Sequence, residues 1–428
     1  MRVLWFSNTP SLAFKKLGSD PNLGGWISSL EKQMAKSKEI DLGVAFPFGF
    51  SHQGSFSIEN TCYYPFPYSR TRSRIGRIID KWKFAIEPED EIEYYLSIIE
   101  QFRPDIIHIF GSERSFGLIV KRCGVPVILQ IQGNLTICSM KWTTGISLSQ
   151  MLRYSDKMNL LLGYSIFHEY YLLRKRSIRE QKILKECKFI IGRTDWDRRI
   201  TKIFAPQSIY YYCDELIREE FYNKRWEYQK NNKTIIISTL SPIAYKGLEV
   251  VLMAASLLKE TKKIDFEWQI AGVKGSEELI KIIERSKRMK FKDTNVKFKG
   301  SMDANRLAET LLNSSCYVHP SHIENSPNSV CEAMIIGLPI IATYAGGIPS
   351  IVKDRSEGIL VQDGDPYALS GAILELLESP ADMKLFSENA KKKALKRHNP
   401  VKIVEEMTSI YRMVLDSSLP RDQQKIDN

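Results

Sequence analysis

The chain has 428 residues, 43% hydrophobic and 26% charged, which is enough for two or three folded domains with the composition of a globular protein. No stretch approaches the roughly 18 uncharged apolar residues of a membrane-spanning helix, and the N-terminus has no apolar core followed by a small-residue cleavage site, so neither a spanning helix nor a signal peptide is expected. The net charge of +11 lies in the first half, since residues 1–212 carry 30 basic and 20 acidic side chains, and such a field favours an anionic partner: a phospholipid surface, a phosphorylated acceptor or nucleic acid.

The first half of the chain alternates apolar runs with amphipathic stretches. Two of the apolar runs end at glycine, in DIIHIFG and PVILQIQG. Strands that are buried on both faces and alternate with helices indicate a parallel sheet covered by helices. We expect strands at 3–7, 41–47, 105–110, 126–132 and 189–192, and helices at 24–36, 89–101 and 164–187.

The pattern restarts after the polar stretch KNNK and predicts a second doubly wound unit. The fold class is therefore α/β, with two Rossmann-like doubly wound parallel-sheet domains facing across a cleft. We expect an N-terminal domain at 1–212, a C-terminal domain at 213–400, a helix at 401–415 that packs back on the first domain, and a disordered tail at 416–428. In the second half, strands are expected at 234–240, 266–272, 296–300, 316–320, 339–343 and 358–361, and helices at 246–260, 277–289, 303–313, 328–336, 366–378 and 381–397.

Polar side chains gather directly after the strand expected at 316–320, in the segment HIENSPNSVCEAM. Ligands of doubly wound sheets bind outside the carboxyl ends of the strands. Glu324 lies in the loop and Glu332 on the next helix, separated by seven residues. The backbone amides of the turn and of the helix N-terminus suit a diphosphate, and the two carboxylates suit hydroxyls of a sugar and a ribose; the alternative is a capped surface helix with solvated glutamates. The candidate binding residues of this turn are Asn325, Ser326, Asn328, Ser329 and Val330.

The spacing of the two glutamates, followed by EAM, GLPIIAT and AGGIPSIV, resembles the retaining glycosyltransferase family 4, the glycosyl transferases group 1. The run from Val318 to Gly364 matches its signature almost continuously, and Lys246-Gly247 stands at the expected place after the first strand of the second domain. The resemblance implies the GT-B architecture, with an acceptor-binding first domain and a nucleotide-sugar-binding second domain.

The resemblance also implies roles for single residues. Glu332 would hold the nucleotide ribose, Glu324 would lie beside the donor sugar, and Lys246 would neutralise the donor diphosphate, which a pyrophosphate leaving group needs. Gly24 and Gly25, after the first strand, would let the backbone approach a phosphate or sugar closely. The structural alternatives are a solvated lysine at a helix start and an ordinary glycine turn.

Two departures from the family pattern matter. The family often has an Arg shortly before the lysine, but the stretch STLSPIAYK offers only hydroxyls there. Arg193 is therefore the candidate for a second phosphate cation, with a structural ion pair as the alternative. The family commonly has a His where Gln132 stands here. Glutamine has no titratable nitrogen, so we expect Gln132 to position a reactant in the catalytic site and not to carry a proton.

No metal or cofactor is expected, since the nucleotide-diphosphate sugar is a substrate. The pair Asp195 and Asp197 looks like a metal-binding DxD motif, but Thr194 to Asp197 is better explained as a capping box that starts a helix. His108 is on a buried strand and is expected in the core. The seven cysteines contain no CxxC pair, which favours reduced cytosolic thiols.

The segment from Tyr63 to Phe84 is rich in aromatic and basic residues, and at helical spacing its isoleucines and Trp82 form an apolar side. A basic amphipathic helix of this kind suits an anionic bilayer surface, while the alternative is a solvated helix packed on the first domain. The basic side chains expected to form a membrane or acceptor surface are Arg70, Arg72, Arg74 and Arg77.

These features predict a retaining glycosyltransferase of hexosyltransferase type. It would move a sugar from a nucleotide-diphosphate-sugar donor to a lipid-linked or polysaccharide acceptor in cell-surface glycan biosynthesis. We expect a cytoplasmic protein, peripheral at the inner membrane face, with no nucleic-acid partner. The alternatives are a sugar-nucleotide epimerase of the same architecture and a non-catalytic basic nucleic-acid-binding protein. The sequence does not name the donor sugar, the base, the acceptor or the linkage.

Overall fold

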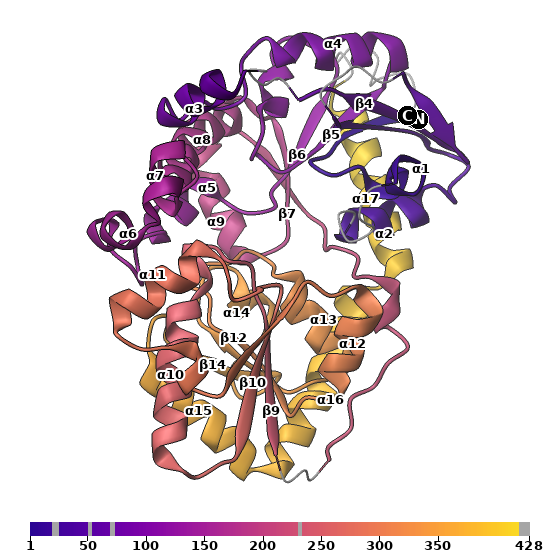
Figure 1. Cartoon of the computed structure of the whole chain (residues 1–428). Helices are drawn as coiled ribbons and strands as arrows, with labels where there is room; N and C mark the ends of the chain where they lie inside the picture. The colour runs from indigo at the N-terminus through magenta and orange to yellow at the C-terminus, as the bar shows by residue number, and fades with distance from the viewer. Residues whose placement is uncertain (19–24, 50–53, 69–72, 230–232, 419–428) are drawn as a thin grey trace. The chain divides into compact units, whose positions relative to one another are not determined.

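A computed structural model of the chain describes residues 1–18, 25–49, 54–68, 73–229 and 233–418. The chain divides into two compact units, each built on one sheet with helices packed against it (Figure 1). Unit 1 holds Met1–Thr136, Arg174–Leu216 and the chain from His398 onward, and unit 2 holds Ile137–Leu173 and Ile217–Arg397. Among the described residues, no helix has both the length and the apolar character that crossing a membrane requires.

The sheet of unit 1 has the strand order β3-β4-β2-β1-β5-β6-β7-β8. Its described pairings are parallel except for the antiparallel edge pair of β3 and β4. Apolar residues alternate between two cores on the two faces: Val3 and Trp5 of β1 face one core, and Leu4 and Phe6 face the other. The strands are β1 (Arg2–Phe6), β2 (Asp41–Pro47), β3 (Phe56–Ile58), β4 (Thr61–Phe66), β5 (Ile106–Phe110), β6 (Val127–Gln130), β7 (Phe189–Gly192) and β8 (Ile209–Tyr212).

Helices cover both faces of this sheet. The core around Trp5 includes side chains of α2 and α17, and the core around Phe6 includes side chains of α4 and α8. The C-terminal helix α17 is fixed on unit 1 by a buried hydrogen bond of 3.0 Å from the indole nitrogen of Trp5 to the hydroxyl of Tyr411. The helices that lie at least partly in unit 1 are α1 (Phe14–Leu17), α2 (Gly25–Met34), α3 (Arg74–Trp82), α4 (Glu91–Phe102), α5 (Leu135–Lys141), α8 (Ile166–Glu186), α9 (Asp195–Phe204) and α17 (Pro400–Asp416).

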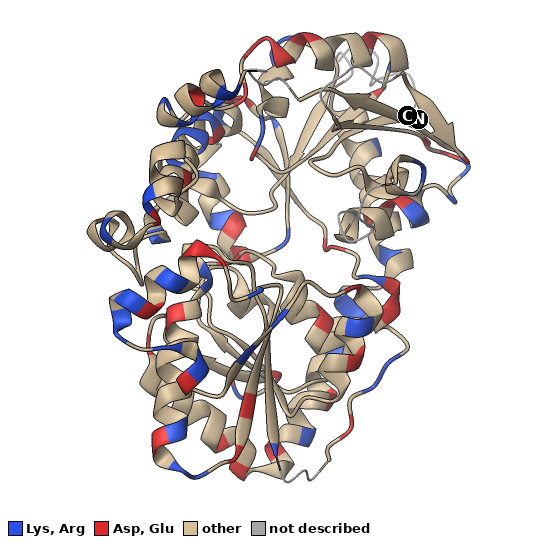
Figure 2. Ribbon diagram, in the orientation of Figure 1, with Lys and Arg blue, Asp and Glu red and all other residues tan. Residues whose placement is uncertain are grey.

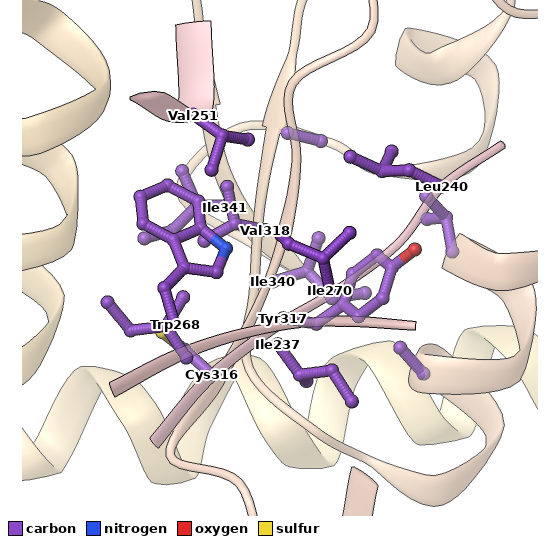
Figure 3. Close-up of a cluster of buried hydrophobic side chains, with 14 of the residues drawn as sticks. Ile237, Leu240, Val251, Trp268, Ile270, Cys316, Tyr317, Val318, Ile340 and Ile341 are labelled. Atoms are coloured by element: carbon purple, nitrogen blue, oxygen red, sulfur yellow. The ribbon is translucent and has the colours of Figure 1, made fainter. Parts of the chain in front are cut away.

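The sheet of unit 2 has the order β11-β10-β9-β12-β13-β14, and its described pairings are all parallel. Its core packs around Trp268 (Figure 3). The indole of Trp268 donates to the hydroxyl of Ser238 (3.0 Å), which donates in turn to the carbonyl of Val318 (2.6 Å). Three neighbouring strands are thereby joined through buried polar atoms that have partners. The strands are β9 (Thr234–Thr239), β10 (Phe266–Ala271), β11 (Val296–Gly300), β12 (Cys316–His319), β13 (Ile340–Thr343) and β14 (Gly358–Val361).

The helices of unit 2 match the predicted alternation with the strands closely. They are α6 (Leu148–Tyr154), α7 (Lys157–Leu162), α10 (Leu248–Thr261), α11 (Glu278–Lys287), α12 (Ala304–Leu312), α13 (Asn328–Ile336), α14 (Ile348–Ile351), α15 (Pro366–Glu378) and α16 (Pro380–Arg397). The prediction of two doubly wound parallel-sheet domains is therefore confirmed. The strands β3, β4 and β8 and the helices α1, α5–α7 and α14 were not among the expected elements.

The chain does not run through one domain and then the other, as the boundary at 212 supposed. The segment 137–173 leaves unit 1 and packs in unit 2 before the chain returns. The carboxylate of Glu278 holds this segment, accepting from the backbone amides of Asp156 (2.9 Å) and Ile166 (3.1 Å) at the two ends of α7. Trp142 and Met151 join the core of unit 2, so apolar burial and these hydrogen bonds both draw the segment there.

Candidate active site

The carboxyl ends of β9, β12 and β13 meet at one edge of the sheet of unit 2, because β12 pairs with both of the others. The loop after β9 leads to Lys246, the loop after β12 carries Glu324, and the loop after β13 carries Gly346. The topology thus brings the predicted lysine, the first glutamate and the glycine segment to the same edge.

Glu324 is held by three side chains through one carboxylate oxygen, Oε1. The ammonium of Lys246 lies 2.5 Å from this oxygen, the Nε2 of His319 lies 3.2 Å from it, and the hydroxyl of Ser321 donates to it at 3.1 Å. Burial alone would raise the pKa of Glu324, but the charge of Lys246 and the contact with His319 outweigh it and lower the pKa to about 2. The side chain is 11% exposed, so this edge holds a partly buried, ionised carboxylate paired with a cation.

Glycine is required where these loops touch. A Cβ on Gly247, which has φ +76°, would lie 2.1 Å from the carbonyl oxygen of Pro320, and one on Gly346, with φ +57°, would lie 1.9 Å from the carbonyl oxygen of Glu324. That carbonyl accepts from the amide of Gly347 at 2.9 Å. The loops carrying Lys246 and Glu324 are therefore held at backbone contact distance, which larger residues would prevent.

Glu332 is paired with an arginine that the sequence analysis did not identify. The Nε and Nη2 of Arg218 each lie 2.8 Å from Oε1 of Glu332, whose side chain is 7% exposed. Burial raises the pKa of Glu332, and Arg218 offsets part of that rise. Arg218 precedes β9 and belongs to no motif, so the only signal in the sequence was that a buried glutamate needs a cationic partner.

The N-terminus of α13 agrees only in part with the predicted anion-binding turn. The first two residues, Asn328 and Ser329, precede the first helical hydrogen bond, so their amides are of the kind that can bind an anion. The amide of Val330 already donates to the carbonyl of Pro327 (3.0 Å) and its side chain is fully buried, so Val330 does not offer a group to a ligand. The side chains of Asn325 and Ser326 are likewise buried in the loop.

A second buried charge cluster ties the 137–173 segment to this edge. The Nε2 of His322 lies 2.5 Å from the carboxylate of Glu249, and its Nδ1 lies 3.5 Å from Asp363. Burial alone would lower the pKa of His322, but these two carboxylates outweigh it and raise the pKa. Lys141 of the segment pairs with Asp363 at 3.1 Å, so the segment contacts the loop that carries the first glutamate through a chain of charges.

In unit 1, Arg193 is a structural residue and not an open phosphate cation. Its side chain is 2% exposed, lies 3.7 Å from the carboxylate of Glu215, and donates to the carbonyl of Gln132 at 3.1 Å. Its guanidinium also lies over the ring of Trp26, 5.5 Å from the centroid. This burial leaves no face of Arg193 for a ligand, which corrects the prediction.

The glycine loop of unit 1 lies only partly within the described residues. Gly24 lies outside them, while Gly25 begins α2 with φ +51° and has open space around the position of a Cβ. Gln132 follows β6 and is half-buried, and the sequence places it where the chain leaves the sheet.

Two other predictions in unit 1 are confirmed. Thr194 and Asp197 form the capping box of α9, with the threonine hydroxyl accepting from the amide of Asp197 at 3.2 Å. His108 is fully buried, and burial lowers its pKa to about 3, so it is a neutral core residue. Its Nδ1 lies 2.7 Å from the hydroxyl of Tyr411.

The helix α3 buries none of its residues, although it is strongly amphipathic in sequence. Ile75, Ile79 and Trp82 are 73%, 46% and 45% exposed. Arg74 and Arg77 lie on the same helix, and Arg70 and Arg72 lie outside the described residues. The ammonium of Lys175 on α8 donates to the carbonyl of Lys83 just beyond α3, so two basic helices are neighbours on unit 1 (Figure 2).

Comparisons with known proteins agree with this geometry. Residues 219–393 match the family model described as Glycosyl transferases group 1. An uncharacterized glycosyltransferase of Methanocaldococcus jannaschii, MJ1178, is 26% identical over 92% of this chain and 96% of its own length. A second one, MJ1069, is 24% identical over 41% of this chain and 53% of its own length. The amylovoran biosynthesis glycosyltransferase AmsK of Erwinia amylovora is 25% identical over 44% of this chain and 47% of its own length. The chain thus spans about half the length of the last two relatives.

Solved structures agree with the fold over the whole chain. Sucrose-phosphate synthase from Thermosynechococcus elongatus has a TM-score of 0.72 at 15% identity, covering 98% of this chain and 100% of that one. HepE of Anabaena, solved with UDP and glucose, has a TM-score of 0.65 at 14% identity, with 98% and 100% covered. At such identities the likeness establishes the shared GT-B fold and nothing about substrates.

Proposed function

We propose that the chain is a member of the glycosyl transferases group 1 that transfers a hexose from a nucleotide-diphosphate sugar to a lipid-linked or polysaccharide acceptor, with retention of the anomeric configuration. The observation that carries the proposal is the convergence of Lys246, Glu324 and the amides of α13 at one sheet edge, within the residues that match the family. The name of AmsK, which refers to biosynthesis of amylovoran, supports a polysaccharide or its lipid-linked precursor as the acceptor.

Unit 2 is proposed to bind the donor. Without donor, the ammonium of Lys246 pairs with the carboxylate of Glu324. A bound diphosphate offers the ammonium a group with more negative charge, so Lys246 turns from the carboxylate to the phosphates when the donor binds. The free amides at the start of α13 add a positive helix end to the same anion. Glu332 receives the ribose hydroxyls through Oε2, because both contacts from Arg218 are to Oε1. Lys246 and the helix end supply the positive charge that the leaving group needs, so we propose a metal-independent reaction.

The proposed transfer step balances without a protein nucleophile. The acceptor oxygen forms a bond to the anomeric carbon on the face that the diphosphate leaves, the carbon–oxygen bond to the phosphate breaks, and the acceptor proton passes to the departing phosphate oxygen. The products are the glycoside and the nucleoside diphosphate. Glu324 is proposed to stabilise, as a carboxylate, the positive charge that develops at the sugar ring. Gln132 is proposed to position a reactant by hydrogen bonding.

The acceptor side of the proposal includes a membrane surface. The exposed apolar residues of α3 and the basic residues of α3 and α8 suit an anionic bilayer, on which aromatic and aliphatic side chains enter the interface and bases meet lipid phosphates. Unit 1 would thus be the acceptor domain, and the protein would be cytoplasmic and bind peripherally to the inner face of the membrane.

Membrane binding can be tested with phosphatidylglycerol-rich vesicles. Each base near an anionic surface contributes about 1 kcal/mol, so Arg74→Ser with Arg77→Ser should weaken binding on the order of tens of fold. Ile75→Ser with Trp82→Ser should also weaken vesicle binding, and this loss should be the same at low and high salt, because apolar insertion is not screened by ions. The matched control, Arg199→Ser with Lys202→Ser on α9, removes the same charge elsewhere on unit 1. If the control releases the protein as readily as the α3 variants, only net charge matters and α3 is not the docking element.

The reaction itself is tested by a thermal-shift panel of nucleotide sugars, begun with UDP-sugars because HepE was solved with UDP and glucose. Each donor that binds is then incubated with protein and alkyl-glycoside acceptors, and the anomeric configuration of the product is read by NMR. Isomerisation of the donor without an acceptor would instead support an epimerase. An inverted product would refute retention, and binding of no nucleotide sugar would refute the proposal.

A further inference from the structure

Polar side chains also converge at the carboxyl edge of the sheet of unit 1. Because β5 pairs with both β1 and β6, the loops after these three strands are neighbours. Asn8 follows β1, Glu113 follows β5 and Gln132 follows β6. Lys246, Glu324 and Glu332, to which the proposed function assigns the donor, lie in unit 2, whereas this second group of polar side chains lies in unit 1.

Glu113 is fixed by its surroundings with its carboxyl group over the strand end. A Cβ on Gly111, which has φ +87°, would lie 1.9 Å from Oε2 of Glu113, so only glycine lets the carboxyl fold back there. The amide nitrogen of Asn8 donates to the same oxygen at 3.2 Å. The guanidinium of Arg179 on α8 donates to the backbone carbonyl of Glu113 at 2.9 Å.

Two buried polar atoms of the residues that follow β1 and β6 lack hydrogen-bond partners among the described residues. One is Oδ1 of Asn8, an acceptor, and the other is Nε2 of Gln132, a donor. A buried polar atom without a partner costs on the order of 1–3 kcal/mol, so such atoms at a strand end call for a ligand or a water. An orphan donor, an orphan acceptor and a carboxyl together match hydroxyl groups, because each hydroxyl both donates and accepts.

We propose that Asn8, Glu113 and Gln132 form a subsite of unit 1 that binds hydroxyl groups of the acceptor glycan. The assignment to an acceptor rests on the glycosyl transfer proposed above. A cationic acceptor group fits less well, because the charge of Arg176 on the neighbouring helix α8 already acts on the carboxyl of Glu113.

The charge state of the subsite follows from its neighbours. Burial and the nearby carboxylate of Glu180 raise the pKa of Glu113 to about 7, while the bond from Asn8 and the charge of Arg176 work in the opposite direction. Near neutral pH the carboxyl is therefore divided between a neutral acid, which donates, and a carboxylate, which only accepts. Acceptor affinity should then change between pH 6 and 8, whereas donor affinity should not follow this group.

The test uses Glu113→Gln and Asn8→Ala in the full chain, with octyl glycosides of glucose, mannose, galactose and N-acetylglucosamine as acceptors and the donor found in the panel. Each variant should raise the acceptor KM about tenfold or more. The donor KM and the melting shift with nucleoside diphosphate should stay at their wild-type values. Glu113→Gln should also abolish the change of acceptor KM between pH 6 and 8. The matched control, Glu100→Gln, alters an exposed glutamate of α4 and should leave all of these values unchanged.

The outcomes separate the two proposals. Wild-type acceptor KM values in both variants, with transfer intact, would overturn the subsite and leave the proposed function standing. Equal losses of donor and acceptor affinity would also overturn it, because they would indicate damage to the fold. A wild-type protein that cleaves the donor but is not accelerated by any octyl glycoside would count against a hydroxyl subsite. Failure to bind any nucleotide sugar would overturn the proposed function, and the assignment to an acceptor with it.

Discussion

Replacing Arg218 by glutamine should weaken nucleoside diphosphate binding, although this arginine is not expected to touch the nucleotide. Its two nitrogens lie 2.8 Å from one oxygen of Glu332, and such charge-assisted contacts contribute about 1.5–3 kcal/mol. Burial keeps the pKa of Glu332 raised even beside Arg218. Removal of the guanidinium therefore raises the pKa of Glu332 further and favours its neutral acid. A neutral Glu332 accepts weaker hydrogen bonds from the ribose, and we expect a loss of about 10–100-fold in nucleotide affinity.

Calorimetry with ribose and deoxyribose nucleotides separates this role from a purely structural one. The wild-type protein should prefer UDP, or the diphosphate of whichever base the panel selects, over its 2′-deoxy analogue. That preference should shrink toward unity in Arg218→Gln and in Glu332→Gln. Because both changes remove the same ribose contact, the double variant should lose little more than Glu332→Gln alone, which is strong non-additivity.

The control breaks a comparable pair that has no site nearby. Arg355 and Glu375 pair on the surface of unit 2 with side chains 54% and 49% exposed, so Arg355→Gln should change neither nucleotide affinity nor the deoxy preference. If Arg218→Gln keeps the full preference for the ribose, or if the two losses add, then Arg218 does not act through Glu332 and the reasoning is refuted. Melting temperatures of the wild type and the four variants show whether unit 2 remains folded.

Three further substitutions and one pH series test the proposed roles of site residues. Lys246→Ala should weaken binding of the nucleoside diphosphate by roughly 1.5–3 kcal/mol more than binding of the nucleoside, and equal losses by calorimetry would make the lysine structural. Glu324→Gln should lower kcat without weakening binding of the sugar-free nucleotide, because the substitution also releases Lys246 from its ion pair. Unchanged turnover in a steady-state assay would mean that Glu324 is not an active-site residue. Gln132→Ala should lower turnover while the pH–rate profile keeps both limbs, and loss of a limb would reveal a titrating group in its place. Because the folded pKa of Glu324 is about 2 against an ordinary value of 4.5, its charge contributes about 3 kcal/mol of stability that is present above pH 4.5 and lost as the pH falls toward 2. The difference in unfolding free energy between the wild type and Glu324→Gln should therefore shrink between pH 5 and pH 2.5, and a constant difference would contradict the ion pair.

The sheets were predictable because their strands are buried on both faces and read as unbroken apolar runs. The runs before Gly111 and after Lys233 illustrate this, since β5 and β9 lie where the pattern placed them. The edge strand β8 was missed because its tyrosines are half exposed and resemble a polar linker. The excursion at 137–173 was missed for a different reason: its local pattern is helical in either unit, and only tertiary partners such as Glu278 decide which unit it joins.

In the candidate site, too, some features were predictable from local sequence and others depended on tertiary contacts. The positions of Lys246 and Glu324 at strand ends followed from local sequence, and the structure brings them into direct contact. The role of Arg193 did not follow, because a sequence does not say whether a guanidinium after a strand faces a ligand or a buried carboxylate such as Glu215. Arg218 belongs to no motif, and its partner is 114 residues away.

The pairing of Lys246 with Glu324 constrains how donor binding can work. The two groups were assigned to different parts of the donor, the diphosphate and the sugar, yet without donor they neutralise each other at 2.5 Å. A cation held by one carboxylate is stabilised less than one facing a diphosphate with more negative charge, so the phosphates can draw Lys246 away. Under the proposed function, Glu324 would then keep its described contacts with Ser321 and His319 and would face the sugar without the charge of Lys246 beside it. In the proposed reaction the carboxylate would therefore be freed for the developing positive charge at the anomeric carbon only when the leaving group is already bound, which would couple recognition of the diphosphate to stabilisation of the transition state.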